Sequence, residues 1–92
     1  MKITFDPEKR KVTLNQRGLD FDDAADLLAG VHFTRPDQRY DYGEDRYISV
    51  GLIGDETIVV VWTQRHDSRR IISMRKADRD EREQYQQWLD RS

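Results

Sequence analysis

The sequence predicts a single α+β domain over residues 1–92, with a small antiparallel sheet, two N-terminal helices and a C-terminal helix. A length of 92 residues with 36% apolar residues suits one modest core and leaves no room for a second domain. Two helical patterns occupy the first third of the chain, and three strand patterns fill the second half. A capped helical pattern ends the chain, so the predicted order is β-α-α-β-β-β-α.

The first predicted elements are a strand and a helix. The segment KITF at residues 2–5 is typical of a short strand. Asp6 is a suitable N-cap, and Pro7 is favoured at the first helical position. A helix is therefore expected over about residues 7–17, and Gly18 suits its C-terminal end.

The second predicted helix lies between Asp20, a suitable N-cap, and Gly30, a suitable stop. Its apolar residues have the spacing of one buried face: Phe21, Ala24, Ala25 and Leu28. The polar stretch over residues 32–45 is interrupted by proline and glycine, which indicates a loop with at most a short strand near residues 31–35.

Three strands are predicted after this loop. Residues 46–53 and 56–64 flank Gly54 and Asp55, a dipeptide suited to a tight hairpin. Residues 69–76 form the third strand, and the three together are expected to make an antiparallel meander.

The last helix begins after Asp78. Glu81 follows at the spacing that completes a capping box. Tyr85, Trp88 and Leu89 form an apolar stripe, which is the face expected to pack on the sheet.

The two faces of the sheet are predicted to differ, because successive strand residues point to opposite sides. One face is almost entirely aliphatic and is expected to lie beneath the helices: Ile48, Val50, Val59, Val61, Ile72 and Met74. The other face is expected to be open: Tyr47, Ser49, Gly51, Val60, Trp62, Arg69, Ser73 and Arg75. An odd loop length before the third strand would reverse its faces.

An open surface of aromatic, hydroxyl and arginine side chains suits single-stranded RNA. Arginine binds phosphate through a fork of donors, and aromatic rings stack on unpaired bases. The alternative is that such residues only keep a half-exposed sheet in solution. Charge favours the first interpretation, because residues 64–82 hold seven basic and four acidic side chains, net +3, whereas the whole chain has a net charge of −2.

Several classes of function are disfavoured. The chain has no cysteine, which excludes disulfides, thiolate metal sites and a thiol nucleophile. The histidines have no companions at metal-ligand spacing and no glycine-rich phosphate loop is present, so neither a metal nor a cofactor is expected. No apolar run is long enough for a membrane span or a secretory signal, so a soluble, cytoplasmic protein is expected.

RNA can be cleaved without a metal if its 2′-hydroxyl attacks the adjacent phosphate while the protein stabilises the charge on the phosphoryl oxygens. Arg75 on the open face, with Arg46 and Arg65 near strand ends, is the predicted catalytic set. The alternatives are an ion pair of Arg46 with Glu44 or Asp45, and simple solvation of Arg65.

Further residues are predicted to bind RNA or to transfer protons. The predicted RNA-binding residues are Lys9, Trp62, His66, Arg69 and Arg70. The general base and general acid stay unassigned among His66, Glu81 and Tyr85, and the last two also have structural roles in the final helix.

Short motifs in order along residues 3–85 carry a resemblance to a known family: FDPEKR, RGLDF, YGEDRY, VVVW, RRIISMRKA and EREQY. The chain resembles the BrnT toxins of type II toxin–antitoxin systems. The resemblance implies a RelE-like fold and a ribonuclease that arrests translation. It also implies a BrnA-like antitoxin in a heterotetramer, with operator DNA bound only through the antitoxin. One departure is Gln16-Arg17-Gly18, where the family commonly has Lys-His-Gly. The remaining alternative is a non-catalytic module whose basic face binds an acidic partner or nucleic acid.

Overall fold

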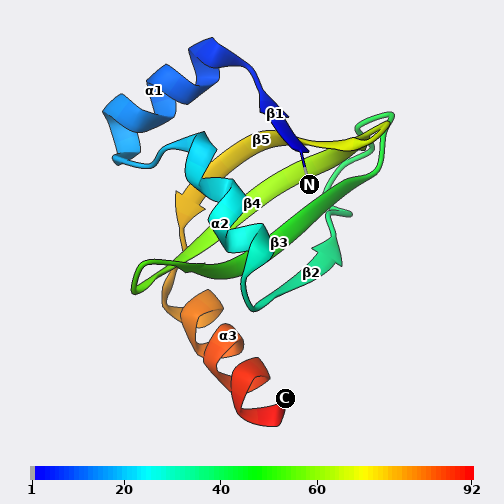
Figure 1. Cartoon of the computed structure of the whole chain (residues 1–92). Helices are drawn as coiled ribbons and strands as arrows, with labels where there is room; N and C mark the ends of the chain where they lie inside the picture. Colours follow the sequence, from blue (N-terminus) through cyan, green and yellow to red (C-terminus); the bar gives the residue numbers. More distant parts are fainter. Residues whose placement is uncertain (1) are drawn as a thin grey trace.

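The computed structural model describes residues 2–92 and shows one five-stranded sheet with three α-helices (Figure 1). In chain order the elements are β1 (Lys2–Phe5), α1 (Pro7–Arg17), a 3₁₀ turn η1 (Phe21–Asp23), α2 (Ala24–Ala29), β2 (His32–Pro36), β3 (Arg46–Ile53), β4 (Glu56–Arg65), β5 (Ser68–Lys76) and α3 (Arg79–Arg91). None of the helices among residues 2–92 has the length and apolar character needed to cross a membrane.

The helix ends form where local chemistry predicts them. The Asp6 carboxylate accepts a hydrogen bond from the Glu8 amide at 2.9 Å, and Gly18 ends α1 with a φ of 68°, a left-handed conformation that favours glycine. At the start of α3, the Asp78 and Glu81 side chains accept each other's backbone N–H groups, so the predicted capping box is confirmed.

The second predicted helix is shorter than expected. It begins as the 3₁₀ turn η1, capped by Asp20, and only the six residues of α2 are α-helical. The short strand expected near residues 31–35 is present as β2.

The sheet has five strands in the order β1-β5-β4-β3-β2. The three predicted strands are confirmed as β3, β4 and β5, each within one residue at either end. The expectation of a purely antiparallel sheet was wrong, because β1 pairs parallel to β5 at one edge while β2 pairs antiparallel to β3 at the other.

A β-bulge in β5 changes which residues share a face. Trp62 pairs with Ile71, but Val61 pairs with Ser73, so Ile72 is an extra residue in the strand. Beyond the bulge, Ser73 and Arg75 therefore lie on the face of Val61 and Val59, and Met74 turns to the opposite face.

Both faces of the sheet carry a core. Helix α2 and η1 cover the first face, here called the α2 face: Leu19, Phe21, Ala24, Leu27, Leu28, Ile58, Val60, Trp62, Ile71 and Met74 are buried there. Helix α3 covers part of the second, the α3 face: Ile48, Val50, Val59, Val61, Ala77 and Tyr85 are buried there. Figure 1 shows α2 in front of the sheet and α3 extending below it, after the end of β5.

The prediction of an open face around Tyr47 and Trp62 was wrong, since that face is the α2 face. Ser49 is 0% exposed and Trp62 is 7% exposed. The indole Nε1 of Trp62 donates to Ser49 Oγ at 2.8 Å, which satisfies both polar groups inside the core. At Gly51 an added Cβ would lie 3.0 Å from Leu27 Cγ, so the glycine allows α2 to pack close to the sheet.

Candidate functional site

Three arginines converge at the end of the sheet formed by the β4–β5 hairpin. Arg46 on β3 and Arg70 on β5 both pair with Thr63 of β4, so they flank it on the α3 face. Arg65 lies two residues beyond Thr63 and therefore points to the same side. These arginines and Glu44 are here called the hairpin-end cluster.

Glu44 connects two members of this cluster. Its Oε2 accepts a hydrogen bond from Arg46 Nε at 3.2 Å, and its Oε1 lies 3.0 Å from Arg65 Nη2. The Arg46 and Glu44 side chains are about one quarter exposed, and that of Arg65 is half exposed. One carboxylate thus bridges two guanidinium groups that solvent can still reach.

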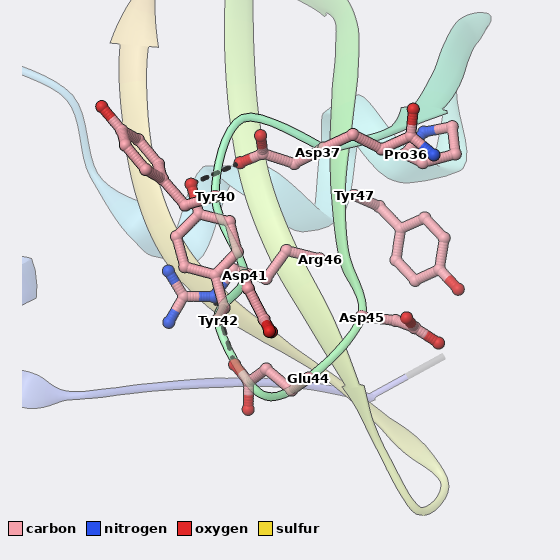
Figure 2. Close-up of a pocket in the computed structure, with 10 residues that line it drawn as sticks. Pro36, Asp37, Tyr40, Asp41, Tyr42, Glu44, Asp45, Arg46 and Tyr47 are labelled. Atoms are coloured by element: carbon pink, nitrogen blue, oxygen red, sulfur yellow. Dashed lines mark hydrogen bonds and ion pairs between the residues drawn. The ribbon is translucent and has the colours of Figure 1, made fainter.

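Residues 37–45, here called the crossing loop, are held at their start by the Asp37 carboxylate. Its side chain is fully buried and accepts hydrogen bonds from Arg39 Nε and Nη2, both at 2.8 Å. It also accepts a hydrogen bond from the Tyr42 hydroxyl at 3.2 Å (Figure 2). The hydrogen bonds from Arg39 lower the pKa of Asp37 to about 2. Asp37 is therefore ionised at neutral pH and fixes the course of the loop.

The end of the crossing loop positions Glu44 and Arg46. Thr63 Oγ1 donates to the Asp45 carbonyl at 2.6 Å, and the Asp37 amide donates to the Arg46 carbonyl at 2.8 Å. The Arg46 guanidinium lies 4.0 Å from the centroid of the Tyr42 ring, within cation–π range. Figure 2 shows Arg46 beneath Tyr42 with Glu44 at the turn of the loop. Hydrogen bonds thus hold the backbone at Asp45 and Arg46, and the Tyr42 ring holds the Arg46 guanidinium.

Two hollows adjoin the cluster. One, of about 410 Å³, is lined by Thr4, Arg65 and Arg70. The other, of about 590 Å³, lies along the crossing loop and carries tyrosine and acidic side chains: Asp37, Tyr40, Asp41, Tyr42, Glu44, Asp45, Arg46 and Tyr47 are among its lining residues (Figure 2). The first hollow is the more suitable for a phosphate, because two of its three lining residues are guanidinium groups.

Arg75 belongs to a different contact. Its Nη1 and Nη2 donate to the two carboxylate oxygens of Glu81 at 2.6 and 2.7 Å. This fork holds the pKa of Glu81 at about 2, although burial acts in the opposite direction. Arg75 pairs opposite Val59, four residues along β4 from Thr63, or about 13 Å of strand. The expectation that Arg75 meets Arg46 and Arg65 at one phosphate does not fit this placement.

Three predicted RNA-binding residues lie outside the hairpin-end cluster. Lys9 of α1 lines a groove of about 280 Å³ whose far wall includes Ser73 of β5. Trp62 is buried on the α2 face and cannot stack on a base in this structure. The Arg69 guanidinium lies 4.6 Å from the Trp62 ring centroid, and burial lowers the pKa of Arg69.

The candidate acids and bases are separated by the fold. His66 lies in the β4–β5 turn with a φ of 53°, directly after Arg65. Tyr85 is buried, and its hydroxyl donates to the Val31 carbonyl at 2.7 Å. Glu81 is occupied by Arg75 and by the Asp78 amide. Of the three, His66 alone adjoins the cluster. Among residues 2–92, no three His, Asp or Glu side chains form a group that could hold a metal ion.

Two site features escaped sequence reasoning. The first is the second contact of Glu44. The sequence suggested Glu44 only as an ion-pair partner of Arg46, since residues two apart in an extended segment point to the same side. Its contact with Arg65 follows if the β3–β4 register is continued beyond the strand, because Arg46 pairs with Thr63. The second feature is Arg17, which donates from Nη1 to the Met74 carbonyl at 2.7 Å and so ties α1 to β5.

Comparison with known families gives one match. A sequence model of the family described as "Ribonuclease toxin, BrnT, of type II toxin-antitoxin system" matches residues 5–81, which is most of the chain. A search of curated proteins found no match. The matched range contains the crossing loop and the whole hairpin-end cluster. The chain therefore belongs to the BrnT family of ribonuclease toxins of type II toxin–antitoxin systems.

Proposed function

We propose that this BrnT toxin cleaves RNA without a metal ion and that the hairpin-end cluster is its active centre. The observation that carries this proposal is the convergence of Arg46, Arg65 and Arg70 on the α3 face around Thr63. Together with Glu44 they carry a formal charge of +2, which attracts a phosphodiester even though the whole chain is acidic.

In the proposed reaction, the 2′-hydroxyl of the RNA attacks the neighbouring phosphorus and the 5′-oxygen leaves in line. Arg46 and Arg65 bind the non-bridging oxygens, where negative charge accumulates in the transition state. Arg70 binds the RNA backbone beside the scissile phosphate. The products are a 2′,3′-cyclic phosphate and a 5′-hydroxyl end.

Type II membership implies an RNA substrate and a protein antitoxin. We propose that RNA cleavage arrests translation in the cytoplasm and that a BrnA-like antitoxin neutralises the toxin in a heterotetramer. In that complex, operator DNA is bound through the antitoxin. The mixed sheet with helices on both faces is consistent with a RelE-like arrangement, which we propose as its fold relationship.

The proposal is tested with purified chain and end-labelled mRNA in the presence of excess chelator. The parent chain should produce fragments with 2′,3′-cyclic phosphate ends, and Arg46→Ala should slow cleavage by about 10²–10³, the usual effect of removing one transition-state donor. Arg91→Ala, at the exposed end of α3, is the matched control and should cleave at the parent rate.

Intact RNA with retained RNA binding by the parent chain would contradict the proposal. It would favour a non-catalytic module whose basic surface binds nucleic acid or an acidic partner.

A further inference from the structure

We infer that Glu44 is the general base of this reaction and takes the proton from the attacking 2′-hydroxyl. The inference rests on the proposed function, because it needs Arg46 and Arg65 at the scissile phosphate. Glu44 is the carboxylate that contacts both of these arginines, through Oε2 to Arg46 and Oε1 to Arg65. A phosphate bound by the two guanidinium groups would therefore lie directly beside this carboxylate.

The contacts of Glu44 allow it to accept a proton once RNA is bound. Arg46 uses one nitrogen, Nε, for its hydrogen bond to Glu44, although a guanidinium has five N–H donors. Arg65 and Glu44 are close enough for an ion pair, at 3.0 Å, and the Arg65 side chain is half exposed. When phosphate oxygens attract these guanidinium groups, the Glu44 oxygens become available to accept a hydrogen bond from the ribose hydroxyl.

The backbone around Glu44 keeps the carboxylate in place during this exchange. The neighbouring Asp45 carbonyl is bound by Thr63, and Arg46 is held beneath Tyr42. The Glu44 side chain is partly exposed to solvent, so a ribose hydroxyl can approach it. A general base must reach the proton that it removes, and this geometry satisfies that requirement for a phosphate between the arginines.

The other candidate carboxylate is unsuitable for the same task. Both oxygens of Glu81 accept hydrogen bonds from Arg75, and Oε1 also accepts from the Asp78 amide. Proton uptake by Glu81 would weaken its two contacts with Arg75, whereas Glu44 lies in a loop and takes no part in a helix cap.

The step balances as follows. The proton of the 2′-hydroxyl moves to a Glu44 oxygen, and the 2′-oxygen forms a bond to phosphorus. The bond between phosphorus and the 5′-oxygen breaks, and its electron pair stays on the 5′-oxygen, which takes a proton from water. Glu44 then releases its proton to solvent.

Single-turnover cleavage of a short labelled RNA by Glu44→Gln, Glu44→Asp and the parent chain tests the inference, together with binding of a 2′-deoxy analogue that cannot be cleaved. Glu44→Gln should cleave about 10²–10⁴-fold more slowly, the usual contribution of a general base. It should bind the analogue at least as tightly as the parent, because a negative charge beside the phosphate is removed. Glu44→Asp should recover part of the rate. Glu56→Gln, an exposed carboxylate paired with Lys76 away from the cluster, is the control and should cleave as the parent does.

A pH–rate profile distinguishes a base from a group that only holds the loop. The parent rate should rise with pH along an acidic limb, and this limb should be absent in Glu44→Gln. A loss of rate with an unchanged acidic limb would overturn the inference.

A Glu44→Gln variant that cleaves as fast as the parent, or faster, would also overturn it. That result would show that the carboxylate only competes with phosphate for the arginines. A parent chain that cleaves no RNA removes the proposed function and this inference together. Parent cleavage with an undiminished Glu44→Gln rate removes the inference alone.

Discussion

Two glutamates hold arginine side chains on the α3 face, and they do so in different ways. Both carboxylate oxygens of Glu81 accept hydrogen bonds from one arginine, Arg75, and the position of Glu81 is fixed by the capping box of α3. Glu44 lies in the crossing loop and divides its two oxygens between Arg46 and Arg65.

We propose that the difference between the two contacts distinguishes a structural ion pair from the active centre. The Arg75–Glu81 contact satisfies its carboxylate completely, which suits a permanent link between β5 and α3. The Glu44 contact leaves donors of two guanidinium groups available at a solvent-accessible point, which suits an exchange with phosphate. Under the proposed function, the less saturated Glu44 contact is therefore the better candidate for the active centre.

After Glu44→Gln, the largest expected effect is on cleavage by Arg65→Ala. Removal of this guanidinium should lower the single-turnover rate by about 10²–10³, because one donor to the phosphoryl oxygens is lost. The melting temperature should change little, since Arg65 is half exposed and its contact with Glu44 is at the surface. An Arg65→Ala chain with parent-like cleavage would remove this arginine from the active centre.

The next effect concerns the support of the crossing loop. Asp37→Ala leaves Arg39 and Tyr42 without their buried acceptor, which should reduce the free energy of unfolding by about 1–3 kcal/mol. Cleavage should also slow, because Tyr42 no longer positions Arg46. Denaturant unfolding and single-turnover kinetics measure the two effects. Lower stability with undiminished cleavage would show that the loop does not position the cluster.

The contact between Glu81 and Arg75 is expected to contribute to the free energy of unfolding. Glu81→Gln weakens the capping box and the fork to Arg75, so the free energy of unfolding should fall by about 1 kcal/mol. Denaturant unfolding at neutral pH checks this value. A large loss of cleavage without a loss of stability would reverse the roles of the two glutamates.

The dependence of stability on pH follows from the same contact. The pKa of Glu81 is about 2 in the folded chain, below its ordinary value of 4.5, so the folded state binds this proton less readily than the unfolded state does. The stabilisation from the ionised Glu81 is present at a pH above the ordinary pKa of 4.5 and is lost as the pH falls towards 2. Asp37 acts in the same direction from its ordinary value of 3.8. Glu81→Gln should therefore show a smaller fall in unfolding free energy over this range than the parent.

The smallest expected effect is at Arg70. If this residue contacts a backbone phosphate of single-stranded RNA, Arg70→Ala should reduce the slope of log affinity against log salt by about 0.7. Affinity for a 2′-deoxy oligonucleotide measured over a range of salt concentrations gives this slope. An unchanged slope would place Arg70 outside the RNA path.

Local signals predicted the elements well. Asp6, Gly18 and Asp78 act through neighbours within a few residues, so the sequence alone places the ends of α1 and the start of α3. The 3₁₀ start of the second helix was missed, because the preference for 3₁₀ over α geometry at Phe21–Asp23 depends on packing against the sheet.

The two faces were harder to predict. The bulge at Ile72 depends on contacts with β4 and α3 that the sequence of β5 does not reveal, and the burial of Trp62 depends on the packing of α2 on that face. That extra residue placed Arg75 and Trp62 on opposite faces of the sheet. Arg46, Arg65 and Arg70 were nevertheless named from the sequence, since arginines near strand ends are natural phosphate ligands.

The most direct test compares Arg46→Lys with Arg75→Lys in the same single-turnover assay, with melting temperatures measured in parallel. Lysine keeps the charge but loses the guanidinium fork. We predict that Arg46→Lys lowers the cleavage rate by at least about tenfold at nearly unchanged stability, and that Arg75→Lys lowers the melting temperature while cleaving close to the parent rate. Parent-like cleavage by Arg46→Lys with a large loss in Arg75→Lys would contradict the assignment of the active centre to the hairpin-end cluster.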